Sequence, residues 1–288
     1  MASSFRIISG LSEIASGYDA LICDVWGVLH NGYRSEPAAV EALYRFRAEQ
    51  GPVVLLTNAP RPIADVESLL KRVGVPLDCY DAIVSSGAVA REDVENRIAA
   101  AGRTLRVYHL GPDRDGGVLG GLDIERVDVA EAEVVLCTGL YDDTTESAED
   151  YAGLFQEMKA RNLTMLCANP DIVVQRGDRL IWCAGALAQA YEKLGGAVVY
   201  YGKPHLPIYE ATLAAARKAA GRAIARPLAV GDGADTDILG ANRAGIEALF
   251  VAQGIHAAQL GELTAEGLAQ LFAVPEAHPK WAMRALVW

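Results

Sequence analysis

Short apolar runs alternate with helix-like segments through the first and last thirds of this 288-residue chain, and this alternation constrains the fold most strongly. A short apolar run bounded by turn residues is typical of a buried strand, whereas an apolar spacing near 3.6 that ends in glycine indicates a helix. Strands are predicted at 20–25, 52–58, 81–86, 197–204, 226–233 and 247–252, and helices at 35–51, 63–74, 87–102, 207–221 and 236–245. Such alternation predicts a parallel sheet covered on both faces.

The middle of the chain is predicted to form a second α/β domain inserted into the first. It has apolar runs at 105–111, 132–139 and 163–170, a Gly-rich link at 113–123 and an acidic link at 141–150. These links are more irregular than those on either side. We therefore assign residues 88–182 to the inserted domain, and residues 1–87 and 183–288 to one discontinuous core domain.

Charge and cysteine content limit the expected partners and compartment. The formal net charge of −11 argues against a nucleic-acid backbone or an anionic membrane as partner. The five cysteines form no Cys-x-x-Cys pair and their number is odd, which favours a reducing compartment. No signal peptide is predicted at the N-terminus, and no apolar run approaches the ~18 residues of a membrane span. The expected location is the cytoplasm.

Polar side chains stand at the ends of four predicted strands. Asp24 ends the first, Thr57 and Asn58 end the second, Lys203 follows a later strand, and Asp232 follows another, with Asp237 five residues on. Taken singly, an aspartate after a strand is most often a turn former or a helix cap. Because ligands bind at the carboxyl ends of strands in open parallel sheets, the set predicts one site.

This combination of residue types suits the transfer of a phosphoryl group. Asp24 could attack phosphorus and form an aspartyl phosphate, which divides one difficult step into two. Asp24 and Asp232 offer hard oxygen ligands for Mg²⁺, with Asp237 holding a metal-bound water. Lys203 would offset negative charge, and Thr57 with backbone N–H groups would donate to the phosphoryl oxygens.

The chain resembles the haloacid dehalogenase superfamily, class IIA, the nitrophenylphosphatase-like and sugar-phosphatase-like branch. The matching stretches are DVWGVLHNG (24–32), LLTNAP (55–60), YGKP (201–204), VGDGADTDILGA (230–241), ANPD (168–171) and CAGALAQAYEKLGG (183–196). They cover nearly the whole length. The resemblance implies a Rossmann-like parallel-sheet core with an inserted α/β cap of the C2 type.

The resemblance also implies roles for individual residues. Asp24 becomes the nucleophile, Thr57 the phosphate-binding hydroxyl, and Lys203 the lysine that stabilises charge. The phosphate site then comprises Gly27, Thr57, Asn58 and Lys203, and the Mg²⁺ site comprises Asp24, the backbone carbonyl of Trp26, Asp232 and Asp237. The expected partner is a small phosphorylated metabolite.

One position departs from the family pattern. Family phosphatases carry an acid two residues after the nucleophile, which protonates the leaving oxygen and then activates water, whereas this chain has Trp26. General acid–base catalysis typically contributes ~10²–10⁴-fold. His30 or His205 would titrate in a suitable range. The first interpretation of each is a loop or packing residue, and replacement of the missing acid is the alternative.

Two other functions stay open at this point. Family dehalogenases also have an aromatic residue in place of the acid, but they attack carbon without a metal, and the retention of Asp232 and Asp237 argues for a cation. A phosphometabolite-binding protein without catalytic activity is the second alternative. The segment 278–288 is expected either to cover an edge of the core or to form a homodimer contact.

Overall fold

The computed structural model describes residues 5–176, 179–273 and 276–288, and the chain forms two compact units. The first unit comprises the chain up to Thr57, Ala64–Val84 and Lys203–Trp288. The second comprises Asn58–Ile63 and Ser85–Gly202. Within the described ranges, no helix has both the length and the apolar character needed to cross a membrane.

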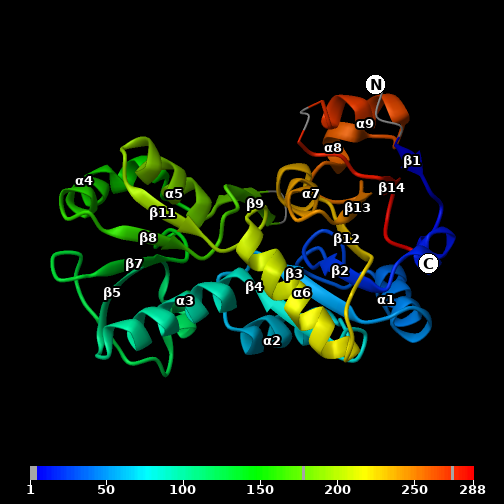
Figure 1. Cartoon of the computed structure of the whole chain (residues 1–288). Helices are drawn as coiled ribbons and strands as arrows, with labels where there is room; N and C mark the ends of the chain where they lie inside the picture. Colours follow the sequence, from blue (N-terminus) through cyan, green and yellow to red (C-terminus); the bar gives the residue numbers. More distant parts are fainter. Residues whose placement is uncertain (1–4, 177–178, 274–275) are drawn as a thin grey trace. The chain divides into compact units, whose positions relative to one another are not determined.

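A seven-stranded sheet forms the first unit, in the order β1-β14-β13-β12-β2-β3-β4 (Figure 1). The strands are β1 (Arg6–Ile7), β2 (Ala20–Asp24), β3 (Val53–Thr57), β4 (Ala82–Ser85), β12 (Pro227–Gly231), β13 (Glu247–Val251) and β14 (Trp281–Met283). The pairs from β1 through β3 are parallel. Every residue of β2 and β3 is buried, as expected for central strands with continuous apolar sequences.

The helices of the first unit are α1 (Pro37–Glu49), α2 (Ile63–Val73), α6 (Leu206–Ala220), α7 (Leu239–Arg243), α8 (Ala257–Leu260) and α9 (Ala265–Leu271). Three of them, α1, α2 and α6, form where the sequence predicts them, whereas α8 and α9 are not predicted. Helix α1 begins with a proline in its first turn and buries Val40, Leu43 and Phe46. Both α1 and α6 pack against β3. The segment predicted as one helix at 236–245 is instead a π-helical turn, Ala234–Ile238, followed by α7.

The second unit contains a five-stranded parallel sheet in the order β11-β8-β7-β5-β6. Its elements are α3 (Ser86–Ala101), β5 (Leu105–Leu110), β6 (Ile124–Arg126), β7 (Val134–Cys137), α4 (Ala152–Ala160), β8 (Thr164–Cys167), α5 (Ala184–Lys193) and β11 (Ala197–Tyr200). Strands β9 (Val173–Arg176) and β10 (Arg179–Trp182) pair antiparallel in a separate two-stranded sheet.

Successive side chains of these strands enter two different apolar clusters. Val135 and Cys137 of β7 pack with α4 and α5, whereas Val134 and Leu136 pack with α3. This is the alternation that a pleated strand imposes. Figure 1 accordingly shows α4 and α5 on one side of this sheet and α3 on the other. The second unit therefore has a hydrophobic core of its own.

The compact units differ from the predicted domains in residues 58–63 and 85–87 and, over a longer stretch, in residues 183–202. The sequence interpretation places the strand at 197–204 in the core, but β11 pairs with β8 in the second sheet, with Ala197 opposite Thr164. Helix α5 also packs in the cluster of the second unit. Apolar periodicity cannot identify a partner strand, and both sheets are parallel. The division into a functional core (1–87 and 183–288) and cap (88–182) stays a prediction.

The packing of α5 yields a prediction about stability. Leu187 is completely buried in the second unit's core, so Leu187→Ala should lower the free energy of unfolding by about 2–5 kcal/mol. Gln189→Ala, at an exposed position on the same helix, should change it by less than about 0.5 kcal/mol. Urea unfolding measures both. Equal effects of the two changes would contradict the assignment of α5 to this core.

Candidate functional site

Adjacent parallel strands carry Asp24 and Asp232 to the same edge of the seven-stranded sheet. Asp24 is the last residue of β2, and Asp232 directly follows β12. The two strands pair in register, with Val230 opposite Cys23. The sequence interpretation that these two acids meet at one edge is consistent with this pairing.

Asp237 joins the two strand-end acids to form a buried cluster. One carboxylate oxygen from each of Asp24, Asp232 and Asp237 lies within 4.8 Å of the others. Their exposed fractions are only 6, 7 and 6 per cent, respectively. In the part of the chain that the structure describes, no other group of three such side chains has this geometry. Three carboxylates this close are unfavourable without a cation.

Lys203 supplies one positive charge to the cluster. Its Nζ donates to Asp24 Oδ1 at 2.5 Å and to Asp237 Oδ1 at 2.8 Å, and the side chain is only 4 per cent exposed. Lys203 lies beside the acids as predicted, but the prediction of which sheet holds the strand before Lys203 is wrong. Lys203 does not follow a strand of the seven-stranded sheet, because the preceding strand, β11, belongs to the other sheet.

Backbone groups hold two of the carboxylates in place. The N–H of Ile255 donates to Asp232 Oδ2 at 2.7 Å, and the N–H of Gly233 donates to Asp237 Oδ2 at 3.1 Å. The hydroxyl of Tyr209 on α6 donates to the backbone carbonyl of Asp237 at 3.1 Å. Sequence analysis missed Ile255 and Tyr209. A hydrogen bond from a backbone N–H does not depend on the residue type, so the sequence does not reveal it. In the sequence, Tyr209 looks like any other residue of a helix.

Two glycines allow the backbone to approach the Asp232 carboxylate. A Cβ at Gly27 would lie 2.3 Å from Asp232 Oδ2, and a Cβ at Gly254 would lie 1.7 Å from the same atom. Gly27 also has a φ of +81°, which side-chain-bearing residues rarely adopt. Gly27 thus lies at the predicted site, next to the acids. Its role in phosphate binding stays a prediction.

Burial and mutual repulsion alter the acidity of the cluster. Burial, followed by the charge of Asp237, raises the pKa of the Asp24 carboxyl well above its ordinary value, although Lys203 opposes this shift. Burial and then Asp237 also raise the pKa of Asp232, to about 7. One lysine therefore does not compensate three buried acids, and strongly shifted pKa values are typical of functional sites.

Thr57 and Asn58 end the neighbouring strand but fall into different units. Thr57 is the last residue of β3, which lies beside β2, and it is 8 per cent exposed. Asn58 belongs to the second unit, where its side-chain amide donates to Asp171 Oδ1 at 2.8 Å. Oδ1 of Asn169 in turn accepts from the N–H of Asp171 at 3.1 Å, which closes a turn around Pro170. The phosphate-binding roles of Thr57 and Asn58 stay predictions.

Trp26 is packed against His30 and Gly32. The Trp26 and His30 rings meet edge to face, with centroids 5.1 Å apart and an interplanar angle of 75°. His30 is 1 per cent exposed, and its Nδ1 accepts from the N–H of Gly32 at 3.0 Å. Burial lowers the pKa of His30 to about 4, which disfavours it as an acid at neutral pH. His205 precedes α6 as its N-cap and is partly exposed.

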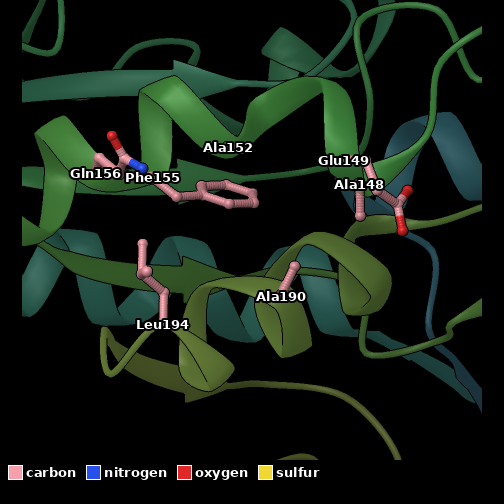
Figure 2. A pocket seen from close by; sticks show the side chains of 7 residues that line it. All are labelled: Ala148, Glu149, Ala152, Phe155, Gln156, Ala190 and Leu194. Atoms are coloured by element: carbon pink, nitrogen blue, oxygen red, sulfur yellow. The ribbon is translucent and has the colours of Figure 1, made fainter.

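A separate surface pocket lies in the second unit, between α5 on one side and α4 with the turn before it on the other. Figure 2 shows its lining residues, which are Ala148, Glu149, Ala152, Phe155, Gln156, Ala190 and Leu194. Its volume is about 190 Å³. Glu149 is the one ionisable side chain in this lining, so the pocket lacks the groups that phosphoryl transfer requires.

The fold and the acid–lysine cluster define a hydrolase of the haloacid dehalogenase type, and the chain belongs to this family. A family model described as haloacid dehalogenase-like hydrolase matches residues 21–125, and a second HAD-hydrolase-like model matches residues 200–272. The class IIA resemblance inferred from the motifs is thereby confirmed.

Three similar proteins illustrate the relationship. A haloacid dehalogenase-like hydrolase from Brucella suis is 42% identical, with a TM-score of 0.85 and coverage of 98% of this chain and 100% of that one. The ribonucleotide monophosphatase NagD of Escherichia coli is 27% identical, over 82% of this chain and 88% of its own length. The glycerol phosphate phosphatase of Mycobacterium tuberculosis, solved with magnesium, is 22% identical with a TM-score of 0.70, over 94% of this chain and 77% of that one.

The raised pKa of Asp232 predicts how the stability of the metal-free protein depends on pH. Between the ordinary aspartate value of 3.8 and about 7, native Asp232 retains a proton that the unfolded chain has lost. The free energy of unfolding should therefore fall as pH rises through this window, by up to about 4 kcal/mol from this group. Asp232→Asn should flatten the fall, whereas Asp235→Asn, at an exposed neighbouring position, should not.

Urea unfolding in excess chelator, at several pH values between 4 and 8, measures this dependence. A wild-type stability that stays level or rises across the window would contradict the environment described for Asp232.

Proposed function

We propose that this protein is a Mg²⁺-dependent phosphohydrolase that acts on a small phosphorylated metabolite, with Asp24 as the nucleophile. The observation that carries the proposal is the buried cluster in which Lys203 bridges Asp24 and Asp237 beside Asp232. This arrangement combines a nucleophilic oxygen, a fixed positive charge and additional oxygen ligands, all at the carboxyl edge of a parallel sheet.

Asp24 would attack phosphorus from its place at the end of β2. A bond forms between an Asp24 oxygen and phosphorus, and the bond from phosphorus to the ester oxygen breaks, which leaves an aspartyl phosphate. Lys203 is already within hydrogen-bond distance of Asp24, so it can offset charge as the phosphoryl group arrives. Thr57, on the neighbouring strand, would donate its hydroxyl to a phosphoryl oxygen.

The donor set fits a hard divalent cation. Three buried carboxylates face one lysine, so two negative charges remain uncompensated when all three acids are ionised. Mg²⁺ prefers oxygen ligands, and Asp24, Asp232, Asp237 and the backbone carbonyl of Trp26 would hold it. When bound, the cation would neutralise charge on the phosphoryl oxygens and orient the ester.

The activities for which the relatives are named support a phosphate ester as substrate. NagD is named as a ribonucleotide monophosphatase, and another relative, 25% identical over 86% of this chain and 67% of its own length, as a D-glycerol 3-phosphate phosphatase. Both act on small phosphorylated molecules. Dehalogenation is disfavoured, because attack on carbon would not require the buried cluster of three acids.

Asp24→Asn tests the covalent step. The amide keeps the shape of the carboxylate but removes the attacking charge, so hydrolysis of 4-nitrophenyl phosphate should fall by at least ~10³-fold, judged from the loss of a nucleophile in other hydrolases. Asp65→Asn, at an exposed position on α2, is the matched control and should keep the wild-type rate. If Asp24→Asn retained most of its activity, Asp24 would not be the nucleophile.

Removal of the cation should abolish turnover, and Mg²⁺ should also stabilise the folded protein measurably. Excess chelator should stop the hydrolysis, and added Mg²⁺ should restore it. At about 100 times its dissociation constant, Mg²⁺ should also stabilise the wild type by ~2.7 kcal/mol and raise its melting temperature, but should have little effect on Asp232→Asn. Full hydrolysis in chelator would contradict the need for a cation, and halide release from a 2-haloacid would favour the dehalogenase alternative.

A further inference from the structure

Trp26 is part of a loop whose backbone packs against the acid cluster. The loop follows Asp24 directly and closes on itself, since the N–H of Gly27 donates to the carbonyl of His30 at 2.9 Å. The N–H groups of Leu29 and His30 both donate to the carbonyl of Val25, at 2.9 and 3.3 Å. The backbone next to Trp26 also lies against the carboxylate of Asp232, as the close approach of Gly27 requires.

The indole ring is held on two sides within this loop. The edge-to-face contact with His30 forms one side. Gly32 forms the other, because a Cβ there would lie 2.7 Å from Cη2 of the Trp26 ring. Gly32 has a φ of +91°, so both its backbone conformation and its lack of a side chain suit this packing. An indole therefore occupies the side-chain position two residues after the nucleophile.

The indole cannot serve in proton transfer. Its N–H is a hydrogen-bond donor only and does not ionise in the relevant range. The ammonium of Lys203 is engaged with Asp24 and Asp237. In the described parts of the chain, the three clustered carboxyl groups are the proposed nucleophile and the proposed cation ligands. When the acids hold the cation they are ionised, so neither they nor Lys203 can protonate a leaving oxygen.

We propose that the substrates of this protein are phosphate esters or acyl phosphates whose leaving oxygen departs without a proton, as a phenolate, an enolate or a carboxylate. This inference rests on the proposed phosphohydrolase function and narrows its substrate class. As the oxygen of Asp24 bonds to phosphorus, the electron pair of the breaking P–O bond goes to the leaving oxygen. A phenolate, enolate or carboxylate carries that charge readily, whereas an alkoxide requires a proton donor.

Release of the phosphate from Asp24 should be slow for the same reason. Water must attack the aspartyl phosphate, the bond from Asp24 to phosphorus must break, and the proton of water must pass to solvent without a positioned base. Inorganic phosphate and free Asp24 result. The first leaving group should consequently appear as a burst of about one equivalent per active site before a slower steady phase.

Three esters of similar size separate leaving-group acidity from fit: 4-nitrophenyl, phenyl and cyclohexyl phosphate. With Mg²⁺ in excess, the wild type should cleave the two aryl esters and show little turnover of the cyclohexyl ester. Trp26→Asp supplies an acid and should raise kcat/KM for cyclohexyl phosphate relative to 4-nitrophenyl phosphate by ~10²–10⁴-fold. Trp26→Asn is the matched control, because asparagine has the shape of the aspartate in Trp26→Asp but cannot exchange a proton. This control should leave the ratio of the two kcat/KM values low.

The possible outcomes distinguish this inference from the proposed function. Replacing so large a ring can cost several kcal/mol, so circular dichroism and melting temperature should be compared for both variants. Wild-type cleavage of cyclohexyl phosphate as fast as that of phenyl phosphate would overturn the inference without any variant. Equal ratios in folded Trp26→Asp and Trp26→Asn would also overturn it. If the wild type cleaves none of the three esters and does not cleave acetyl phosphate either, the proposed function itself would be overturned.

Discussion

The site depends on one buried cation, the ammonium of Lys203, which is hydrogen-bonded to Asp24 and Asp237. Removing one partner from a buried ion pair is strongly destabilising, because the remaining charge lies in a medium of low polarity. Here one lysine faces three acids, so the cluster keeps an excess of negative charge even when Lys203 is present. The surrounding backbone must hold these acids together against their repulsion.

The backbone achieves this through elements whose positions depend on the sheet. Strands β2 and β12 fix Asp24 and Asp232 as neighbours, and the N–H groups of Ile255 and Gly233 donate to Asp232 and Asp237. Such an arrangement lowers stability locally. In the proposed function it would require little reorganisation when a cation and a phosphate group bind, and preorganised charge is usually a large contribution to catalysis. The raised pKa values of Asp24 and Asp232 reflect the same local cost.

If the proposed function holds, the loop that contains Trp26 separates cation binding from proton transfer. A backbone carbonyl is present whatever the side chain, so replacement of an acid by an indole does not remove a proposed cation ligand. In the proposed mechanism, the side chain at this position instead determines whether a proton donor stands beside the leaving group. The packing of Trp26 against His30 and Gly32 indicates that the loop accommodates the indole as a regular part of its structure.

The sequence by itself determined most of the strands and helices, because apolar periodicity reports which faces of an element are buried. It also determined which residues could form the site, since Asp24, Asp232, Asp237 and Lys203 carry the chemistry in their side chains. Only the tertiary structure decided that β11 pairs with β8 in the second sheet, and that Lys203 nevertheless reaches Asp24. It alone identified the N–H of Ile255 and the close approach of Gly254 to Asp232. The physical reason is that strand pairing and backbone contacts depend on residues far apart in the chain, whereas periodicity and residue type are local properties.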